Sequence, residues 1–168
     1  MEQPALLEMR DITKEFPGVK ALDGVSLTVR PGTVHALMGE NGAGKSTLMK
    51  VLCGIHSRDA GEIEYFGKPV NFANIAESQA AGISIIHQEL NMMNHLTVAQ
   101  NIYIGREPKK GKYFVDAKKR LKDCQTLLDM MGLDYNPNEK MGNLSVAQRQ
   151  MIEILKSLSR NARVIIMD

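Results

Sequence analysis

A glycine-rich stretch, residues 39–46, constrains what this chain can fold into more than any other part of it. Its sequence, GENGAGKS, matches the phosphate-binding pattern G-x-x-x-x-G-K-[ST] at every fixed position. The preceding residues 34–38, VHALM, predict a buried strand, and residues 47–53, TLMKVLC, predict a helix with one apolar face. A strand, this loop and a helix in succession predict a site for a nucleoside di- or triphosphate.

The residue types in this loop explain the chemistry. Glycines let the backbone wrap closely around an anion where a Cβ would obstruct it, and the following helix directs N–H groups and partial positive charge at the same phosphates. We expect Lys45 to reach the β- and γ-phosphates and the Ser46 hydroxyl to bind Mg²⁺. The alternative, a glycine-rich turn before a capped helix, does not require all the fixed positions together. The residues expected to contact the nucleotide are Gly39, Glu40, Asn41, Gly42, Ala43, Gly44, Lys45, Ser46 and Thr47.

Composition narrows the class of protein. Of the 168 residues, 43% are hydrophobic and 24% are charged, which is typical of one compact globular domain with room for a small inserted lobe. The net charge of +2 is too small to indicate nucleic-acid binding. No apolar run approaches the ~20 residues that cross a bilayer. The two cysteines and four histidines show no metal-ligand spacing, and the cysteine usage fits a reducing cytosol.

The other strands divide into two kinds. Residues 6–13, 25–29 and 62–67 alternate between apolar and polar side chains, which predicts a small antiparallel sheet beside a parallel core. Residues 82–86 and 164–168 are short apolar runs that predict buried strands.

Helices dominate between residues 90 and 158. Thr97 with Gln100, and Ser145 with Gln148, form the S/T-x-x-Q pattern of a capping box, and Asp116 is placed to cap a helix between them. Residues 109–112, KKGK, predict an exposed loop. We therefore expect an α/β fold with three parts: a nucleotide-binding core with an antiparallel β subdomain at 1–89, a helical subdomain at 90–158, and a strand at 159–168 that returns to the core.

Three residues outside the loop are candidates for nucleotide or metal contact. Gln88 follows the strand at 82–86 and Asp168 ends the strand at 164–168, and ligands of open α/β sheets lie at such carboxyl ends. Asp168 is well placed to hold Mg²⁺ beside the loop, whereas the alternative is an acid facing solvent. Phe16 lies in a bend where it could stack on a base or serve as a half-buried aromatic. A polar residue after a strand is common, so position alone does not decide whether Gln88 contacts a ligand. Position alone also leaves both interpretations of Phe16 open.

Taken in order, these residues resemble the ATP-binding cassette of ABC transporters over nearly the whole chain. Phe16 matches the family's adenine-stacking position, which Val19 and Ala21 accompany, and residues 39–46 match its Walker A loop. Gln88 matches the Q-loop, residues 144–148 match the signature motif, and residues 164–168 match the Walker B strand. The resemblance implies ATP as the nucleotide and a P-loop fold with an antiparallel β subdomain and a helical subdomain.

The resemblance also implies the roles of particular residues. Lys45 would hold the phosphates, and Mg²⁺ would be organised by Ser46, Gln88 and Asp168. Ser145 would act in trans on the nucleotide of a second cassette, in a dimer that buries ATP between one loop and the other signature helix. The signature here is LSVAQ, where most cassettes have glycines in place of Val146 and Ala147, so the clamp on that nucleotide is expected to be weaker.

The amino-acid sequences of two segments are similar to those of bacterial monosaccharide importers of the ribose/galactose/xylose type. These segments are FPGVKAL at 16–22 and HALMGENGAGKSTLMK at 35–50. In such importers two cassettes are usually fused in tandem, and the match is to the first cassette. The resemblance implies an ATPase at the cytoplasmic face of the bacterial inner membrane, held there peripherally by transmembrane permease subunits. The resemblance also implies a periplasmic or extracellular sugar-binding protein as an indirect partner.

The sequence stops at the Walker B aspartate, before the position at which the family carries its catalytic glutamate. On the resemblance, this 168-residue form is expected to bind ATP without hydrolysing it, and the intact protein is expected to be the ATPase. A nucleotide-binding module without hydrolysis is one alternative function. A non-transport cassette ATPase of translation or DNA repair is another, although the mild charge disfavours it. A small-molecule P-loop kinase would not need the signature helix.

Overall fold

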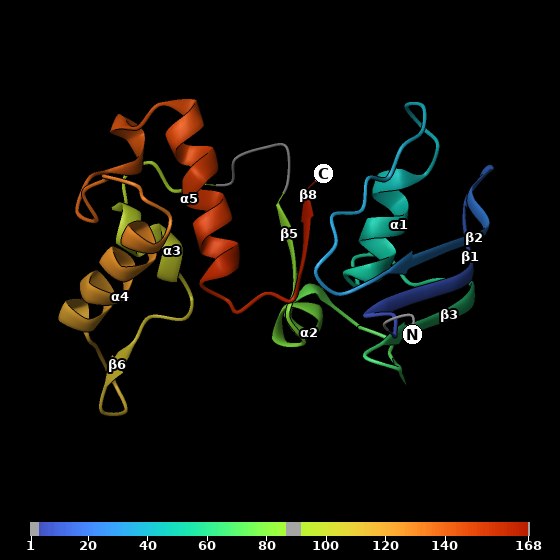
Figure 1. The fold of residues 1–168 in the computed structure, drawn as a ribbon, viewed down its shortest axis with the longest axis horizontal. Coiled ribbons are helices and arrows are strands. Elements are labelled where there is room, and N and C mark those ends of the chain that lie inside the picture. The colour runs from blue at the N-terminus through green and yellow to red at the C-terminus, as the bar shows by residue number, and fades with distance from the viewer. Residues whose placement is uncertain (1–3, 87–91, 168) are drawn as a thin grey trace. The chain divides into compact units, whose positions relative to one another are not determined.

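The computed structural model describes residues 4–86 and 92–167 (Figure 1). The chain divides into two compact units, Met1–Ile83 and Ser84–Asp168. Within the described ranges, none of the helices has the length and apolar character that a bilayer span requires.

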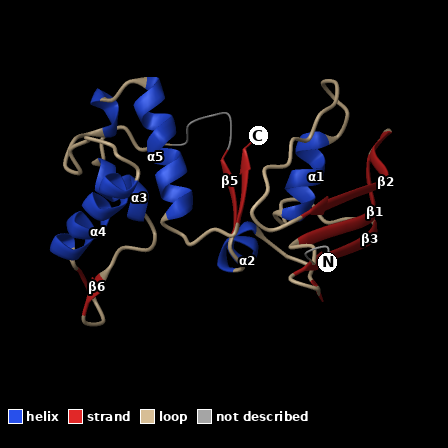
Figure 2. Cartoon of the chain, in the orientation of Figure 1, coloured by secondary structure: helices blue, strands red, loops and turns tan. Residues whose placement is uncertain are grey.

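The first unit is built on a four-stranded antiparallel sheet in the order β2-β1-β3-β4 (Figure 2). Its strands are β1 (Leu7–Phe16), β2 (Val19–Val29), β3 (Ala60–Tyr65) and β4 (Lys68–Pro69). The alternating segments of the sequence therefore form the antiparallel sheet that was predicted from them. β1 and β2 are longer than predicted, because their pairing continues up to the turn at residues 17–18.

A bulge in β1 sets which side chains face the core. Met9 and Ile12 are both buried although they are three residues apart, because the register of the sheet shifts between them at Asp11, whose φ is +52°. Gly61 of β3 lies against the bulge with a φ of +91°. A Cβ there would come within 2.5 Å of the carbonyl oxygens of Arg10 and Asp11, so only glycine allows this approach.

Two helices complete the first unit. Helix α1 (Lys45–Leu52) contacts β2 and buries Leu48, Val51 and Leu52, as the apolar spacing of residues 47–53 predicted. Helix α2 (Ile75–Ala80) was missed by the sequence analysis, although Asn74 and Glu77 supply a capping signal. The Asn74 side chain accepts a hydrogen bond from the Glu77 N–H at 3.0 Å, and the Glu77 carboxylate accepts one from the Ala73 N–H at 2.9 Å.

The buried strand predicted at residues 34–38 is wrong. This segment has no strand geometry, and Val34 and Met38 are exposed to 102% and 88%. A strand needs a hydrogen-bonded neighbour, and no strand of the described residues forms a ladder with this segment. The apolar composition of residues 34–38 predicts burial, but it does not predict whether another strand pairs with them.

The second unit contains a strand pair and a helical lobe. β5 (Ile83–Ile86), which starts at the boundary of the units, pairs with β8 (Val164–Met167), and the two strands run in the same direction (Figure 1). The lobe consists of α3 (Val98–Tyr103), α4 (Ala117–Met130), the 3₁₀ turn η1 (Met141–Asn143) and α5 (Val146–Leu158). β6 (Lys109–Lys110) and β7 (Phe114–Val115) form a short hairpin where a loop was predicted.

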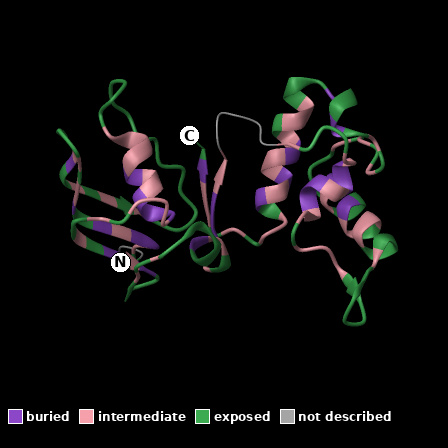
Figure 3. Cartoon of the chain, turned by 180° about the vertical axis from the view of Figure 1, so that it is seen from behind, coloured by how far each residue is buried: buried purple, intermediate pink, exposed green. Residues whose placement is uncertain are grey.

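The helical lobe has its own apolar core, seen as the buried segments of its helices in Figure 3. The predicted caps are all present. Thr97 and Ser145 each form a complete capping box, and the Asp116 carboxylate accepts from the Lys119 N–H at 2.9 Å. The buried residues of this core are Val98, Ala99, Ile102, Cys124, Leu128, Met141, Leu144, Ile152 and Leu155.

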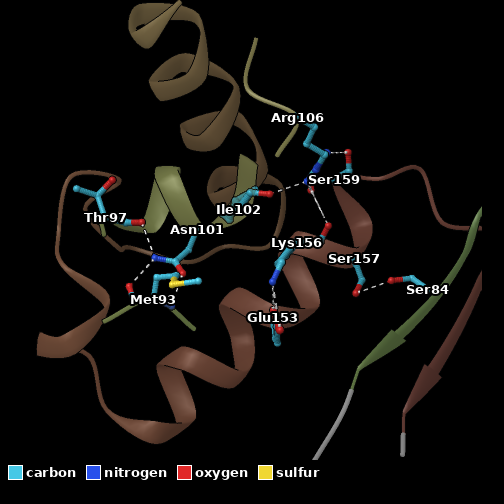
Figure 4. A network of polar contacts seen from close by, with 10 residues as sticks. All are labelled: Ser84, Met93, Thr97, Asn101, Ile102, Arg106, Glu153, Lys156, Ser157 and Ser159. Atoms are coloured by element: carbon cyan, nitrogen blue, oxygen red, sulfur yellow. Dashed lines mark hydrogen bonds and ion pairs between the residues drawn. The ribbon is translucent and has the colours of Figure 1, made fainter. Parts of the chain in front are cut away.

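Polar contacts join the C-terminal ends of α3 and α5 (Figure 4). Arg106, just after α3, donates to the carbonyls of Ile102 at 2.7 Å and Ser159 at 2.9 Å, and so caps the C-terminal ends of both α3 and α5. Burial, together with the nearby charge of Arg160, lowers the pKa of Arg106 from its usual value. The Ser84 hydroxyl of β5 donates to the hydroxyl of Ser157 on α5 at 3.0 Å, and both residues are buried.

Candidate nucleotide-binding site

The glycine-rich loop and the helix that follows it form the center of the candidate site. The Lys45 ammonium donates to the backbone carbonyls of Gly39 and Glu40, both at 2.8 Å, and the Ala43 N–H donates to the Glu40 carbonyl at 3.1 Å. Lys45 thus folds back over the start of its own loop. These partners are neutral carbonyls, which bind an ammonium less strongly than phosphate oxygens do.

Gly44 joins the loop to β2. It has a φ of +87°, and a Cβ on it would lie 2.5 Å from the carbonyl oxygen of Ala21 and 2.8 Å from Cδ2 of Leu22. The structure therefore brings Ala21, one of the predicted nucleotide contacts, against the phosphate-binding loop. This close approach explains why the pattern requires a glycine directly before the lysine.

Helix α1 begins without a side-chain cap. Its N-cap residue is Gly44, which has no side chain to accept from the first N–H groups, and its first turn holds no acid. The other α-helices of the described residues are capped by side chains, namely Asn74, Thr97, Asp116 and Ser145. A helix end that lacks a cap and an acid of its own is suited to an anion from outside the helix.

Phe16 lies at the end of β1 and is half-buried. Its ring meets the ring of His56 edge to face at 5.2 Å, and the Lys14 ammonium lies 5.5 Å from its centroid. Val19, the first residue of β2, is 57% exposed. Sequence analysis identified Phe16 and Val19 but missed two neighbours of the ring. His56 reaches Phe16 only when the chain folds, whereas Lys14 lies two residues before Phe16 on the same strand.

An ion pair fixes the position of Lys14. Its ammonium donates to the Asp59 carboxylate at 2.8 Å, and the same carboxylate accepts from the Glu15 N–H at 2.7 Å. The hydrogen bond from Lys14, followed by that from Glu15, holds the pKa of Asp59 below its usual value. Asp59 therefore keeps its charge and holds Lys14 in place near the Phe16 ring.

The signature segment opens α5 in the second unit. Ser145 is the N-cap: its Oγ accepts from the Gln148 N–H at 3.3 Å, and its N–H donates to the Gln148 side chain at 2.9 Å. Because Oγ acts here as an acceptor, its own O–H remains able to donate to an anion. Val146 is 63% exposed, so its side chain stands on the surface beside this cap.

Arg149 holds the signature turn in shape, and sequence analysis missed it. Its guanidinium donates to the carbonyls of Leu144 at 2.9 Å and Gly142 at 3.0 Å. Arg149 lies one turn into α5, and its two contacts therefore join the turn η1 to the start of this helix. The only signal in the sequence was an arginine four residues after the predicted cap.

Gln88 and Asp168, two predicted metal-binding residues, lie outside the described residues. The strands that precede them, β5 and β8, are adjacent. Among the residues that the structure does describe, no three His, Cys, Asp or Glu side chains cluster as a metal site would require. Ser46 and Thr47, in the first turn of α1, are half-buried.

An α/β unit that carries a phosphate-binding loop, and a helical unit that carries a capped signature turn, define a nucleotide-binding cassette of the P-loop type. Comparison with solved structures agrees. A nucleotide-free ATP-binding cassette from an ABC transporter matches with a TM-score of 0.84 and 30% identity, over 98% of this chain and 69% of that chain. A cassette in its ADP conformation matches with a TM-score of 0.85 and 29% identity, over 97% and 68%.

The sequence comparisons narrow the class further. The protein family described as ABC transporter matches residues 22–168, and the chain belongs to this family of nucleotide-binding proteins. It is 54% identical to the galactose/methyl galactoside import ATP-binding protein MglA of Sodalis glossinidius, over 97% of this chain and 32% of that protein. It is 53% identical to a putative ribose/galactose/methyl galactoside import ATP-binding protein of Agrobacterium fabrum, over 99% and 33%.

The chain thus spans about a third of the length of the curated relatives that it matches. The predicted α/β fold of an ABC cassette and the predicted family are confirmed. The predicted division at residues 89 and 158 and the roles of the individual site residues stay predictions.

Proposed function

We propose that this chain is the first nucleotide-binding cassette of an ATPase that energises the import of a monosaccharide across the bacterial inner membrane. The observation that carries the proposal is the start of α1, where an uncapped helix end and the Lys45 ammonium face the same loop. The similarity to galactose and ribose import proteins supports the transport function and the class of sugar.

Lys45 would exchange partners when ATP binds. Its ammonium leaves the carbonyls of Gly39 and Glu40, 2.8 Å away, for the β- and γ-phosphates, and the N–H groups at the start of α1 donate to the same anion. Phe16 would stack on the adenine, with Val19 and Ala21 beside it. The edge-to-face contact between the Phe16 and His56 rings supports this role, because it fixes the Phe16 ring while the flanking Val19 stays exposed.

Mg²⁺ would be organised by Ser46, Gln88 and Asp168. Hydroxyl, amide and carboxylate oxygens are the donors that Mg²⁺ prefers. The adjacency and common direction of β5 and β8 support the joint role of Gln88 and Asp168, since each residue follows one of these strands. The bound ion would neutralise the charge that develops on the phosphates during hydrolysis.

Ser145 would act in trans on the nucleotide of a second cassette. Its O–H, at the positive N-terminal end of α5, would donate to a γ-phosphate, and the Arg149 contacts keep the turn in shape. In this proposal the dimer drives transmembrane permease subunits, and a sugar-binding protein outside the membrane delivers the sugar. The subunit would then sit peripherally on the cytoplasmic face of the inner membrane and would bind no nucleic acid.

The binding step is tested by titrating MgATP into the purified chain by isothermal calorimetry. We expect Lys45→Ala to weaken binding at least tenfold, because it removes a charge-assisted contact to the phosphates. Lys50→Ala, on the same helix but in its last turn, is the matched control and should bind MgATP as the unaltered chain does. Equal affinity of the Lys45→Ala variant and the control would refute the phosphate-binding role.

The transport step is tested with the intact protein and its permease in cells. Uptake of labelled galactose and ribose should fall to background when Lys45→Ala is introduced into the intact protein and should persist with Lys50→Ala. Phosphate release by the purified intact protein should follow the same pattern. If the intact protein hydrolyses ATP but Lys45→Ala does not reduce the uptake of either sugar, a non-transport cassette is favoured. If the intact protein binds ATP without releasing phosphate, a nucleotide-binding module is favoured.

A further inference from the structure

The β6–β7 hairpin of the second unit carries lysines at its exposed tip. Lys109 pairs with Val115 and Lys110 with Phe114, and the Asp116 N–H donates to the Pro108 carbonyl at 2.7 Å to close its base. Figure 3 shows the hairpin exposed along its length. Within the described ranges, no carboxylate forms an ion pair with its lysines, Lys109, Lys110 and Lys112.

Large apolar side chains stand beside these lysines. Tyr113 is 79% exposed, Phe114 76% and Val115 50%, and the Lys112 ammonium lies 5.5 Å from the centroid of the Tyr113 ring. Exposure of three consecutive apolar residues to water is unfavourable in free energy, and these side chains do not pack against the core of the lobe to offset it. They indicate a surface that is covered when the protein works.

Helix α4, which follows directly, extends the positive charge. Lys118 and Lys119 lie in its first turn, which holds no acid, although a positive charge at a helix N-terminus opposes the helix dipole. Lys122 is one turn beyond Lys118, and helical spacing puts all three lysines away from the buried Cys124 side of the helix. Asp116 caps this helix end and is the one acid of residues 109–122, so these lysines leave a net positive charge there.

The charge is concentrated strongly in this part of the chain. Residues 109–122 hold seven of the 21 Lys and Arg residues and one acid, Asp116, for a net charge of +6, whereas the whole chain has a net charge of +2. The remaining residues therefore carry a net charge of −4. A positive surface on an otherwise negative chain is a local feature and not a general excess of basic residues.

We infer that the β6–β7 hairpin and the first turns of α4 bind the surface of an anionic lipid bilayer. The basic hairpin patch consists of Lys109, Lys110, Lys112, Tyr113, Phe114, Val115, Lys118, Lys119 and Lys122. Lysines attract anionic headgroups, and aromatic side chains enter the interface between headgroup and acyl chain, so both halves of the patch match one partner. A lipid surface fits this projecting hairpin better than a protein groove does, since each lysine of β6 lies across from an apolar residue of β7 and both kinds of side chain meet the same partner.

This inference deepens the proposed function, because a transporter subunit works at a bilayer, but lipid binding requires neither ATP nor a permease. The test is sedimentation of the purified chain with phosphatidylcholine vesicles, with and without phosphatidylglycerol. We expect binding only to the vesicles that contain phosphatidylglycerol. The combined Lys109→Gln, Lys110→Gln, Lys112→Gln variant should bind them roughly a hundredfold more weakly, at about fivefold for each lysine near the surface.

A control of equal charge separates the patch from net charge. Lys20→Gln, Lys68→Gln and Lys140→Gln together remove the same charge from exposed positions outside the patch and should leave binding within about twofold of the original. Tyr113→Ser with Phe114→Ser should remove the part of the binding that persists at high salt. Met130→Ser, another exposed apolar position, should not change it.

The outcomes separate the competing partners. Equal vesicle binding by the hairpin and control lysine variants, with circular dichroism unchanged, overturns the inference. Capture of the chain by polyglutamate, without binding to vesicles, overturns it in favour of an acidic protein segment. The Lys45→Ala variant should bind vesicles normally, so a failure of the nucleotide proposal and a failure of the lipid proposal are distinguishable.

Discussion

Replacement of Gly44 by alanine tests how the phosphate-binding loop is built. Gly44 has a φ of +87° and sits against β2, where a Cβ would approach the Ala21 carbonyl oxygen to 2.5 Å and Leu22 Cδ2 to 2.8 Å. Gly67, in the turn between β3 and β4, provides a matched control. Its φ is +68°, and nothing lies within 4 Å of the position that a Cβ would take.

The two variants differ in the contact and share the backbone strain. An L-residue in the left-handed region costs roughly 1–2 kcal/mol, which is the whole effect expected for Gly67→Ala. Gly44→Ala adds an overlap with a backbone atom that cannot rotate away, and overpacking of this kind costs a further ~1–3 kcal/mol. We therefore expect Gly44→Ala to lower the free energy of unfolding by about 2–5 kcal/mol.

Urea denaturation followed by circular dichroism measures both changes, and calorimetry measures MgATP affinity in each variant. Gly67→Ala should bind MgATP normally, whereas Gly44→Ala should bind weakly because the loop must move off β2. Equal unfolding free energies for the two variants would show that Gly44 does not approach β2 as described. Normal MgATP binding by a destabilised Gly44→Ala variant would show that the approach serves stability alone.

Three further predictions concern polar groups that are buried or half-buried. Ser157→Ala leaves the Ser84 hydroxyl buried without a partner and should cost about 1–3 kcal/mol in urea denaturation; addition of Ser84→Ala should recover part of this loss, and strict additivity would contradict a direct contact. Arg106→Met uncaps two helix ends and should cost about 1–3 kcal/mol, more than Arg106→Lys, which keeps a donor. Burial raises the pKa of Cys53 and Cys124 to about 11, so the native thiols hold protons that unfolded thiols release. Stability should therefore fall as the pH rises from about 9 to about 11, and a flat urea midpoint over that range would argue against their burial.

Features that depend on a few consecutive residues could be predicted from the sequence. The capping boxes at Thr97 and Ser145 formed as expected, because the hydroxyl, the backbone N–H and the glutamine side chain all lie within one turn. The same locality made the cap of α2 at Asn74 predictable in principle. The glycine pattern of residues 39–46 likewise specified the irregular loop and the start of α1.

Features that depend on distant neighbours could not be predicted in this way. Residues 34–38 have the apolar composition of a buried strand, but whether they form one depends on a partner strand elsewhere in the chain. Residues 109–112 were expected to be an exposed loop, and the pairing of Lys109 with Val115 and of Lys110 with Phe114 makes them part of a hairpin. Their exposure was predicted from the lysines alone, while the exposed aromatic residues next to them were not.

The start of α1 shows why motif and neighbourhood contribute different things to a binding site. Gly44 leaves the helix without a side-chain cap, and Lys45 directly after it supplies a cation, so the proposed phosphate contacts depend on two adjacent residues. The base has no such local code. Phe16 and His56 lie 40 positions apart and meet only after β1 has paired with β2 and with β3. In the proposed site a local pattern holds the phosphates and tertiary structure holds the base, so we expect changes to the sheet to alter the choice of nucleotide base before they alter the affinity for phosphate.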